Sequence, residues 1–351
     1  MTPYTIAFYV HHHGSGHFMR SLAIAKALNH DKIIFLGSDL NRFKNILPDN
    51  IQILDLPMDT PLSTDSKFEM GSGVDCFHYA PLQVLGISER TSTITKLFVD
   101  SRPLLLIVDV SVEVALLARL CGIPTIIIRQ HGKRTDLPHK LAYQSAELLI
   151  APFGKELETS KEFEVLNKTF YSGGFSRYTG KEVKVNAFKD QVAILIGKGG
   201  SSLTLDVIAH IAIQCPDQYF HVLGGFKSSG KEHPLNITFH GLTDDVQEIL
   251  TRCALVIGNL GHNTVMEIAT VEKSFIGIPE NRPFDEQVDK GQAMKDIQGF
   301  KIVLPKDVYR TDWQSLIAEL LDTTSEMGQI INPDALDEIA FKIEQVAIKL
   351  F

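Results

Sequence analysis

The feature that most constrains the fold of this chain is the regular alternation of short apolar runs with amphipathic segments. The apolar runs are typical of buried strands and the segments between them of helices, and this order predicts a parallel α/β architecture. In such sheets ligands bind where strands end and helices begin, so the informative residues should follow strands. The strands are expected at residues 4–10, 32–37, 104–109, 125–130, 148–151, 192–197, 219–223, 237–240, 255–257 and 275–278.

A turn-rich segment, 171–180 (YSGGFSRYTG), divides this alternation into two halves. The length of 351 residues also suits two domains, because soluble domains usually hold roughly 100–200 residues. We therefore predict two Rossmann-like, doubly wound domains that face a central cleft, at residues 1–175 and 176–334. A last helix, 335–351, follows and can pack back on the first domain. Residues 57–83 are rich in Pro, Gly, Ser and Asp without periodicity, which is typical of a long functional loop.

The composition argues against several classes of protein. A net charge of −8 disfavours an electrostatic nucleic-acid or anionic-membrane surface. The four cysteines form no CxxC pair, which disfavours a disulfide framework or a zinc site and favours the cytoplasm. The N-terminus lacks a signal-peptide pattern, and no apolar run approaches the ~18 residues of a membrane-spanning helix. We expect a cytoplasmic protein with no nucleic-acid partner and with weak or no membrane association.

The first predicted strand runs into HHHGSGHFMR, residues 11–20. Gly14 and Gly16 permit a tight turn and a close backbone approach to a ligand at the helix that follows. His17 then lies in the first helical turn and faces the cleft, where it could act as a general base or as a donor to a leaving phosphate. The structural alternative is a glycine turn with a capping histidine. The three consecutive histidines point to alternate faces of a strand, so we do not expect a metal there.

Two more turns follow strands in the second half. In residues 197–202 (GKGGSS) the backbone amides and the hydroxyls of Ser201 and Ser202 suit a pyrophosphate. In residues 258–264 (GNLGHNT) small and polar residues open a helix, and the Glu267 carboxylate one turn on could take both hydroxyls of a ribose. The alternative for the second turn is a capping box, Thr264-x-x-Glu267, with only a structural role.

A fourth feature, residues 278–287 (IPENRPFDEQ), places acidic and amide groups between a strand and a helix. Asp285 and Gln287 could bind sugar hydroxyls, since paired acceptor and donor groups suit them. The alternative is an acidic first turn that complements the helix dipole. Each motif is weak alone, but their order and their positions after strands are jointly specific.

These residues resemble GT-B glycosyltransferases of family 28, the family of the N-acetylglucosaminyltransferase that makes lipid II. HGSGHFMRSLAIAKAL, LCGIPTIIIRQHG, IGKGGSS and FHGLTDDVQEILTRCALVIGNLGHNTVMEIA carry the resemblance over nearly the whole chain. It implies the GT-B fold, a ribose contact for Glu267, a uracil contact for the Leu242 backbone and a donor-sugar contact for Gln287. GSGHFMR is also similar to the start of the nucleotide-sugar hydrolases of pseudaminic acid synthesis.

The resemblance and the motifs together predict the site residues. The predicted catalytic residues are His17, Asp109 and His131, with Asp109 placed at a strand end where it could instead cap the next helix. On the acceptor side we expect His13, Glu113 and Gln130. The predicted donor-binding residues are Gly16, Gly199, Gly200, Ser201, Ser202, Leu242, Gly261, His262, Asn263, Thr264, Glu267, Asp285 and Gln287.

The predicted function is transfer of a sugar from a UDP-sugar to an unidentified acceptor, as in cell-envelope or polysaccharide biosynthesis. No DxD sequence occurs where a metal-dependent transferase would need one, so we expect neither metal nor cofactor beyond the UDP-sugar substrate. Members of this family commonly invert the anomeric carbon. Asp59, Asp65, Glu69 and Asp75 lie where the lipid II enzyme has a hydrophobic and basic patch, which argues against that acceptor. The alternatives are a hydrolase in which His17 activates water and a non-catalytic nucleotide-sugar-binding protein.

Overall fold

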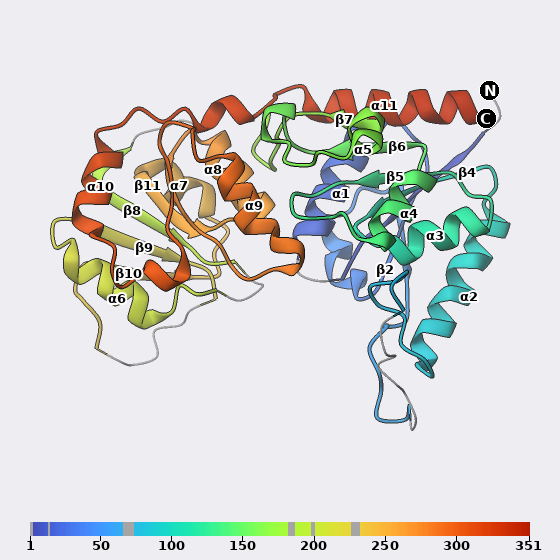
Figure 1. Ribbon diagram of the computed structural model, residues 1–351, viewed down its shortest axis with the longest axis horizontal. Coiled ribbons are helices and arrows are strands. Elements are labelled where there is room, and N and C mark those ends of the chain that lie inside the picture. The colour runs from blue at the N-terminus through green and yellow to red at the C-terminus, as the bar shows by residue number, and fades with distance from the viewer. Residues whose placement is uncertain (1–2, 13–14, 66–73, 182–186, 198–200, 226–231) are drawn as a thin grey trace.

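The computed structural model describes residues 3–12, 15–65, 74–181, 187–197, 201–225 and 232–351, and it contains two parallel β-sheets covered by helices (Figure 1). All of the strand pairs described are parallel, which confirms the predicted α/β class with two doubly wound domains. His13, Gly199 and Gly200, which were predicted as site residues, lie outside the described residues. Within the described part of the chain, no helix is both long and apolar enough to cross a membrane.

The first sheet has the strand order β3-β2-β1-β4-β5-β6-β7. The order reverses between β1 and β4, so the crevice at the carboxyl ends of these two strands is where a ligand is expected. The strands are β1 (Thr5–Tyr9), β2 (Ile33–Gly37), β3 (Ile51–Asp55), β4 (Leu104–Asp109), β5 (Thr125–Ile128), β6 (Leu148–Ala151) and β7 (Thr169–Tyr171). The helices between them are α1 (Gly16–Ala27), α2 (Leu85–Asp100), α3 (Val112–Leu120), α4 (Leu137–Ser145) and α5 (Phe163–Lys168).

The second sheet has the order β10-β9-β8-β11-β12-β13, with its reversal between β8 and β11. Residues 201–202 and the turn at 258–264 follow these two strands, so both lie at the expected ligand crevice. The strands are β8 (Phe188–Leu195), β9 (Tyr219–Leu223), β10 (Ile237–Gly241), β11 (Cys253–Asn259), β12 (Ser274–Ile278) and β13 (Phe300–Ile302). The helices are α6 (Leu205–Gln214), α7 (Val246–Arg252), α8 (His262–Thr270), α9 (Glu286–Ala293) and α10 (Trp313–Leu321).

The last helix, α11 (Ala335–Leu350), crosses back from the second domain and lies along the first (Figure 1). Its buried side chains, among them Ile339 and Ile343, pack into the core formed by β1 and α1. The chain passes between the domains twice: the outgoing crossing contains Gly174 and Phe175, and the return crossing contains Ile330 and Asn332. The two crossings are hydrogen bonded to each other, because Gly174 N donates to Ile330 O at 2.8 Å and Asn332 N donates to Gly174 O at 2.9 Å. Two paired segments therefore connect the domains.

The strands β3, β7 and β13 were not predicted from the sequence. Each lies at the edge of its sheet, and β7 and β13 have only three residues apiece. Edge strands bury less of their surface, so their side chains do not form the continuous apolar runs that mark the central strands.

Candidate active site

His17, Arg20 and Asp109 form a buried charged cluster at the carboxyl ends of β1 and β4. His17 and Arg20 lie on α1, one turn apart, and Asp109 is the last residue of β4, the neighbour of β1. Asp109 Oδ2 is 3.1 Å from His17 Nδ1, and Arg20 Nη2 donates to Asp109 Oδ1 at 2.5 Å. Burial would raise the pKa of Asp109, but Arg20 and His17 outweigh it and lower that pKa to about 2. Asp109 is therefore ionised at neutral pH.

Two neighbours compete for the His17 Nδ1 atom. Asp109 can only accept, which favours a proton on Nδ1, whereas Arg20 Nη2 lies 3.2 Å from Nδ1 and can only donate. Arg20 Nη2 donates over a shorter distance, 2.5 Å, to Asp109 Oδ1, so we assign the proton to His17 Nδ1 and the lone pair to Nε2. His17 is about one-fifth exposed, and its Nε2 has no hydrogen-bond partner among the described residues. This arrangement makes His17 competent as a general base.

The backbone at Val110 turns sharply between Asp109 and α3. Val110 has φ 70°, an uncommon conformation for a β-branched residue that costs on the order of 1–3 kcal/mol. Ser111, and not Asp109, is the N-cap of α3, because its hydroxyl accepts from Val114 N at 3.3 Å. The alternative in which Asp109 only caps a helix is therefore excluded, and the turn leaves the Asp109 carboxylate directed at α1.

The N-terminus of α8 lies against the N-terminus of α1. Asn263 Nδ2 donates to Gly16 O at 3.2 Å across the domain boundary. The N-cap of α8 is Gly261, which offers no side-chain acceptor to the first amides of the helix. Since Thr264 is inside the helix rather than at its N-cap, the Thr264-x-x-Glu267 capping box does not form. The uncapped amides are suited to an anion.

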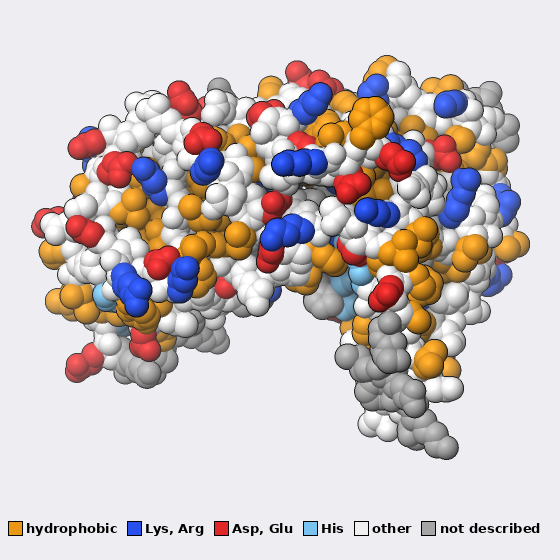
Figure 2. All heavy atoms as spheres, viewed as in Figure 1, with side chains coloured by type: hydrophobic (Ala, Val, Ile, Leu, Met, Phe, Trp, Pro, Cys, Tyr) orange, Lys and Arg blue, Asp and Glu red, His pale blue; other side chains and the backbone are white. Residues whose placement is uncertain are grey.

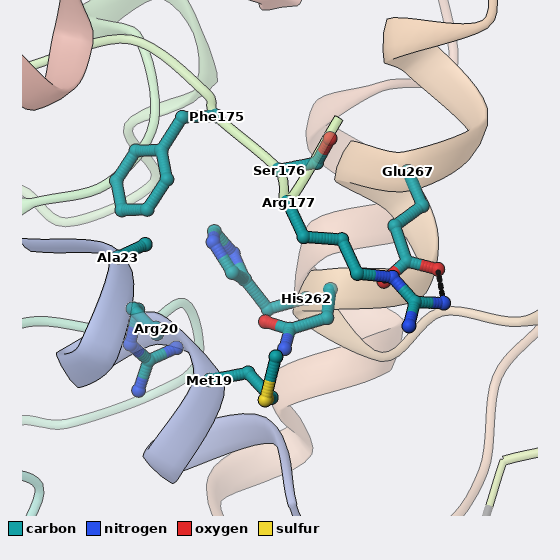
Figure 3. Close-up of a pocket in the computed structure, with 9 residues that line it drawn as sticks. Met19, Arg20, Ala23, Phe175, Ser176, Arg177, His262 and Glu267 are labelled. Atoms are coloured by element: carbon teal, nitrogen blue, oxygen red, sulfur yellow. Dashed lines mark hydrogen bonds and ion pairs between the residues drawn. The ribbon is translucent and has the colours of Figure 1, made fainter. Parts of the chain in front are cut away.

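Glu267 faces a pocket between the domains and forms a two-point ion pair with Arg177 (Figure 3). Arg177 Nε is 3.0 Å from Glu267 Oε1, and Arg177 Nη2 donates to Oε2 at 3.3 Å. Burial raises the pKa of Glu267 against the opposing effect of Arg177. The sequence reasoning missed Arg177, although it lies within the predicted linker YSGGFSRYTG.

His262 lines the same pocket, together with Arg20 of α1 and Phe175 of the outgoing crossing (Figure 3). Its Nε2 atom is buried and has no hydrogen-bond partner among the residues described. Burial and the nearby Lys290 and Arg20 lower the pKa of His262 well below 6.5. This histidine is neutral at physiological pH.

Ser201 and Ser202 bind a carboxylate of their own chain. Glu280, just after β12, receives hydrogen bonds on one oxygen, Oε1, from Ser201 Oγ (3.1 Å), Ser202 N (2.7 Å) and Ser202 Oγ (3.1 Å). The carboxylate at these donors belongs to the protein itself, and the binding of a pyrophosphate by this turn stays a prediction. Glu280 was missed by the sequence reasoning, and its position directly after a strand adjacent to β11 was the available signal.

Gln287 supports the backbone just before α8 and just after β12. Its Oε1 atom accepts from Leu260 N at 3.0 Å and from Glu280 N at 2.9 Å, and the side chain is buried. Asp285 instead pairs with Lys133 of the first domain at 2.9 Å, in an exposed contact. Leu242 is 72% exposed and follows Gly241, whose φ of 65° favours glycine; its contact with a nucleobase stays a prediction.

His131, predicted as catalytic, and the predicted acceptor-side residues Glu113 and Gln130 have hydrogen-bond partners other than His17. His131 is buried against the Phe153 ring and its Nε2 donates to Leu157 O at 3.2 Å; burial and Lys290 lower its pKa well below 6.5. Gln130 accepts from Arg134 Nη2 at 3.0 Å. Glu113 accepts from the backbone nitrogens of residues 78 and 79 at 2.8 and 3.1 Å, which ties that loop to α3.

One group of side chains has metal-ligand atoms close together: His78, Asp136 and His139, within 4.8 Å of one another. Arg134 Nη1 lies 3.0 Å from His139 Nε2 and can only donate, so the His139 proton is on Nδ1 and is donated to Asp136 Oδ1 at 2.6 Å. A metal at Nδ1 would need the opposite tautomer. The group is better explained as a hydrogen-bonded dock for Phe284 of the second domain, whose ring lies 5.0 and 4.7 Å from the His78 and His139 rings.

The two domains enclose a hollow, and histidine side chains are visible on its first-domain wall (Figure 2). Residues 184–341 match the glycosyltransferase family 28 C-terminal domain. No curated protein matches the chain.

Three solved structures are similar along the full length of the chain. They are the MurG of Acinetobacter baumannii (TM-score 0.58, 18% identity, covering 99% of each chain), a UDP-glucosyltransferase of Polygonum tinctorium (TM-score 0.68, 13% identity, 98% of each chain) and the glycotransferase of kitacinnamycin (TM-score 0.67, 13% identity, 98% of this chain and 99% of that one). At these identities the similarity shows the fold, and that fold is GT-B.

Proposed function

We propose that this chain, which has the GT-B fold and matches the glycosyltransferase family 28 C-terminal domain, is a glycosyltransferase that transfers a sugar from a UDP-sugar to an acceptor hydroxyl without a metal ion. The observation that carries this proposal is the contact between the two helix N-termini. His17, oriented by Asp109, lies next to Gly16, and Gly16 accepts a hydrogen bond from Asn263 in the first turn of α8. A base and an anion site thus meet at one point of the cleft.

The first domain supplies the base. The Nε2 atom of His17 takes the proton of the acceptor hydroxyl as its oxygen attacks the anomeric carbon, and the carbon–oxygen bond to the diphosphate breaks. The imidazolium that forms is stabilised by Asp109, which Arg20 keeps ionised. A positioned base of this kind contributes roughly 10²–10⁴ to the rate.

The second domain supplies the donor site. The amides at the start of α8 stabilise the negative charge that develops on the leaving diphosphate, and the donors of residues 201–202 add to this when the Glu280 carboxylate moves away from them. Glu267 takes the ribose hydroxyls once Arg177 releases or shares its carboxylate, and the exposed Leu242 backbone meets the uracil. A single displacement with the base and the leaving group on opposite sides inverts the anomeric carbon.

The test is nucleotide release from UDP-, GDP- and dTDP-sugars, each with and without a cell extract that supplies acceptors. We expect UDP release only with the extract, and an unchanged rate in EDTA. Release without any acceptor would instead establish a hydrolase that uses His17 to activate water. Binding of the nucleotide-sugar without release under any condition would establish a non-catalytic binding protein.

A further inference from the structure

Lys290 is a buried lysine whose side chain is only 1% exposed. It lies on α9, and its Nζ atom donates to Leu260 O at 3.1 Å, with Glu286 Oε1 at 3.7 Å. A buried ammonium group is costly unless it is paired, and lysine is almost never fully buried without such a reason. The position of Lys290 therefore calls for a functional account.

Lys290 and Gln287 bind the two backbone groups of one residue, Leu260. Gln287 accepts from Leu260 N, and Lys290 donates to Leu260 O. The two side chains are three residues apart on α9 and so lie on one face of that helix. Both backbone groups of Leu260 are thus bonded to α9, immediately before the N-cap of α8.

The Leu260 side chain is also closely packed, against two glycines. A Cβ atom at Gly277 would lie 2.6 Å from Leu260 Cδ2, and one at Gly291 would lie 2.8 Å from Leu260 Cδ1. Only glycine permits this approach of β12 and α9 to the Leu260 side chain. The turn that presents the α8 amides is therefore held rigidly by its supports.

Lys290 faces two further cations, Arg20 and Arg134 of the first domain, which pair with Asp109 and Glu286 respectively. Burial is the largest cause that lowers the pKa of Lys290 to about 8; Arg20 and Arg134 also lower it, and Glu286 opposes them. The pKa values of the nearby His131 and His262 lie well below 6.5. Both arginines have a carboxylate partner, and Glu286 is 3.7 Å from Lys290 Nζ, so an anion bound at the start of α8 would interact favourably with the Lys290 charge.

We propose that Lys290 is a positioning residue for the donor diphosphate: it fixes the turn at residues 259–261 so that the first amides of α8 point at the phosphates, and it places a fixed positive charge behind them. The inference rests on the proposed function, because it assigns the diphosphate to the α8 N-terminus. It adds to that function an internal cation contributed by α9.

The test compares Lys290→Met, which keeps the length of the side chain but removes its charge and its donor, with Lys306→Met, an exposed lysine of the same domain. Calorimetric titration of the full chain measures the affinity for UDP and, separately, for inorganic pyrophosphate. We expect Lys290→Met to weaken both by about 10- to 100-fold, the range for losing a hydrogen bond with a charged partner, and Lys306→Met to change neither. Unchanged affinities in Lys290→Met, with only the melting temperature altered, would overturn the proposal.

The pH dependence gives a readout that a packing role would not produce. Lys290 is charged below about pH 8, so the UDP affinity of the wild type should fall as the pH rises through that value. The other charged and titratable groups that face it are Arg20, Arg134, Glu286, His131 and His262, and the pKa values of both histidines lie well below this range. Loss of the alkaline fall in Lys290→Met supports the proposal, and its persistence would contradict it.

The two probes separate the failure of this inference from that of the proposed function. If the wild type binds pyrophosphate but not UDP, and Lys290→Met loses the pyrophosphate, the role of Lys290 stands and the nucleotide assignment falls. If the wild type binds neither, both fall. Should Lys290→Met not fold, Lys290→Gln and the wild-type pH profile decide the question in the same way.

Discussion

The turns that meet across the cleft use different parts of the chain for their chemistry. After β1 and β4 the first domain presents charged side chains, with His17 and Asp109 in direct contact. After β11 the second domain presents backbone amides at the start of α8, and its side chains at 287 and 290 serve to hold that backbone. A site made of side chains should fail when one of them is removed, whereas a site made of backbone should lose affinity in smaller steps.

The largest effect should come from removing the base. His17→Ala should lower turnover by about 10²- to 10⁴-fold while UDP affinity stays unchanged, because Nε2 acts only on the acceptor. The measurement is the kcat of UDP release beside calorimetric UDP affinity, with His233→Ala, an exposed histidine of the second domain, as the control. A parallel loss of UDP affinity would show that His17 belongs to the donor site instead.

Asp109→Asn tests the tautomer of His17. Arg20 can only donate, so the new amide must turn its oxygen to Arg20 and its nitrogen to His17 Nδ1, which moves the histidine proton to Nε2. We expect turnover to fall by roughly 10- to 10⁴-fold with little change in UDP affinity. The nitrogen-15 shifts of the His17 ring report the tautomer directly, and an unchanged Nδ1–H form would refute this explanation.

Glu267→Ala should act on binding and leave the base intact. Loss of an ionised acceptor for the ribose hydroxyls should weaken UDP binding by about 10- to 100-fold. The matched ligand is inorganic pyrophosphate, which has no ribose and should bind equally well to wild type and variant. A variant that loses both ligands equally would place Glu267 in the support of the fold.

The smallest effect is expected at Glu280, whose carboxylate occupies the donors of Ser201 and Ser202. Glu280→Ala should free these donors and raise pyrophosphate affinity by about 5-fold, corresponding to roughly 1 kcal/mol for a typical hydrogen bond. Calorimetry checks the gain. A loss of affinity would mean that Glu280 supports the turn at residues 201–202. Both turns of the second domain would then be held in place by side chains, as Gln287 and Lys290 hold the turn before α8.

The sequence was sufficient for the fold class and for the turns that follow the central strands. It predicted these because strand ends, glycines and helix starts are local patterns, as at Gly16, Ser201 and Gly261. It did not predict Arg20, Arg177, Glu280 or Lys290, because each is defined by a distant partner: Arg20 meets Asp109 across 89 positions and Arg177 meets Glu267 across 90. Only the packing of the sheets brings such partners together.

His131 shows a different limit. A strand at 125–130, as predicted, would have placed His131 at the carboxyl ends of the strands of the first sheet, but β5 ends at Ile128. Arg129 then pairs with Glu158, and the chain turns His131 under Phe153. A burial of this kind depends on residues 153–158, which nothing in the local pattern connects to His131.

The position of α11 has a consequence for the order in which the chain is made. Ile339 and Ile343 complete the core around β1 and α1, yet they leave the ribosome after the whole second domain. Part of the apolar surface of the first domain therefore stays uncovered until α11 has been synthesised. The domain made first is completed last, by a helix that lies after the second domain in the chain.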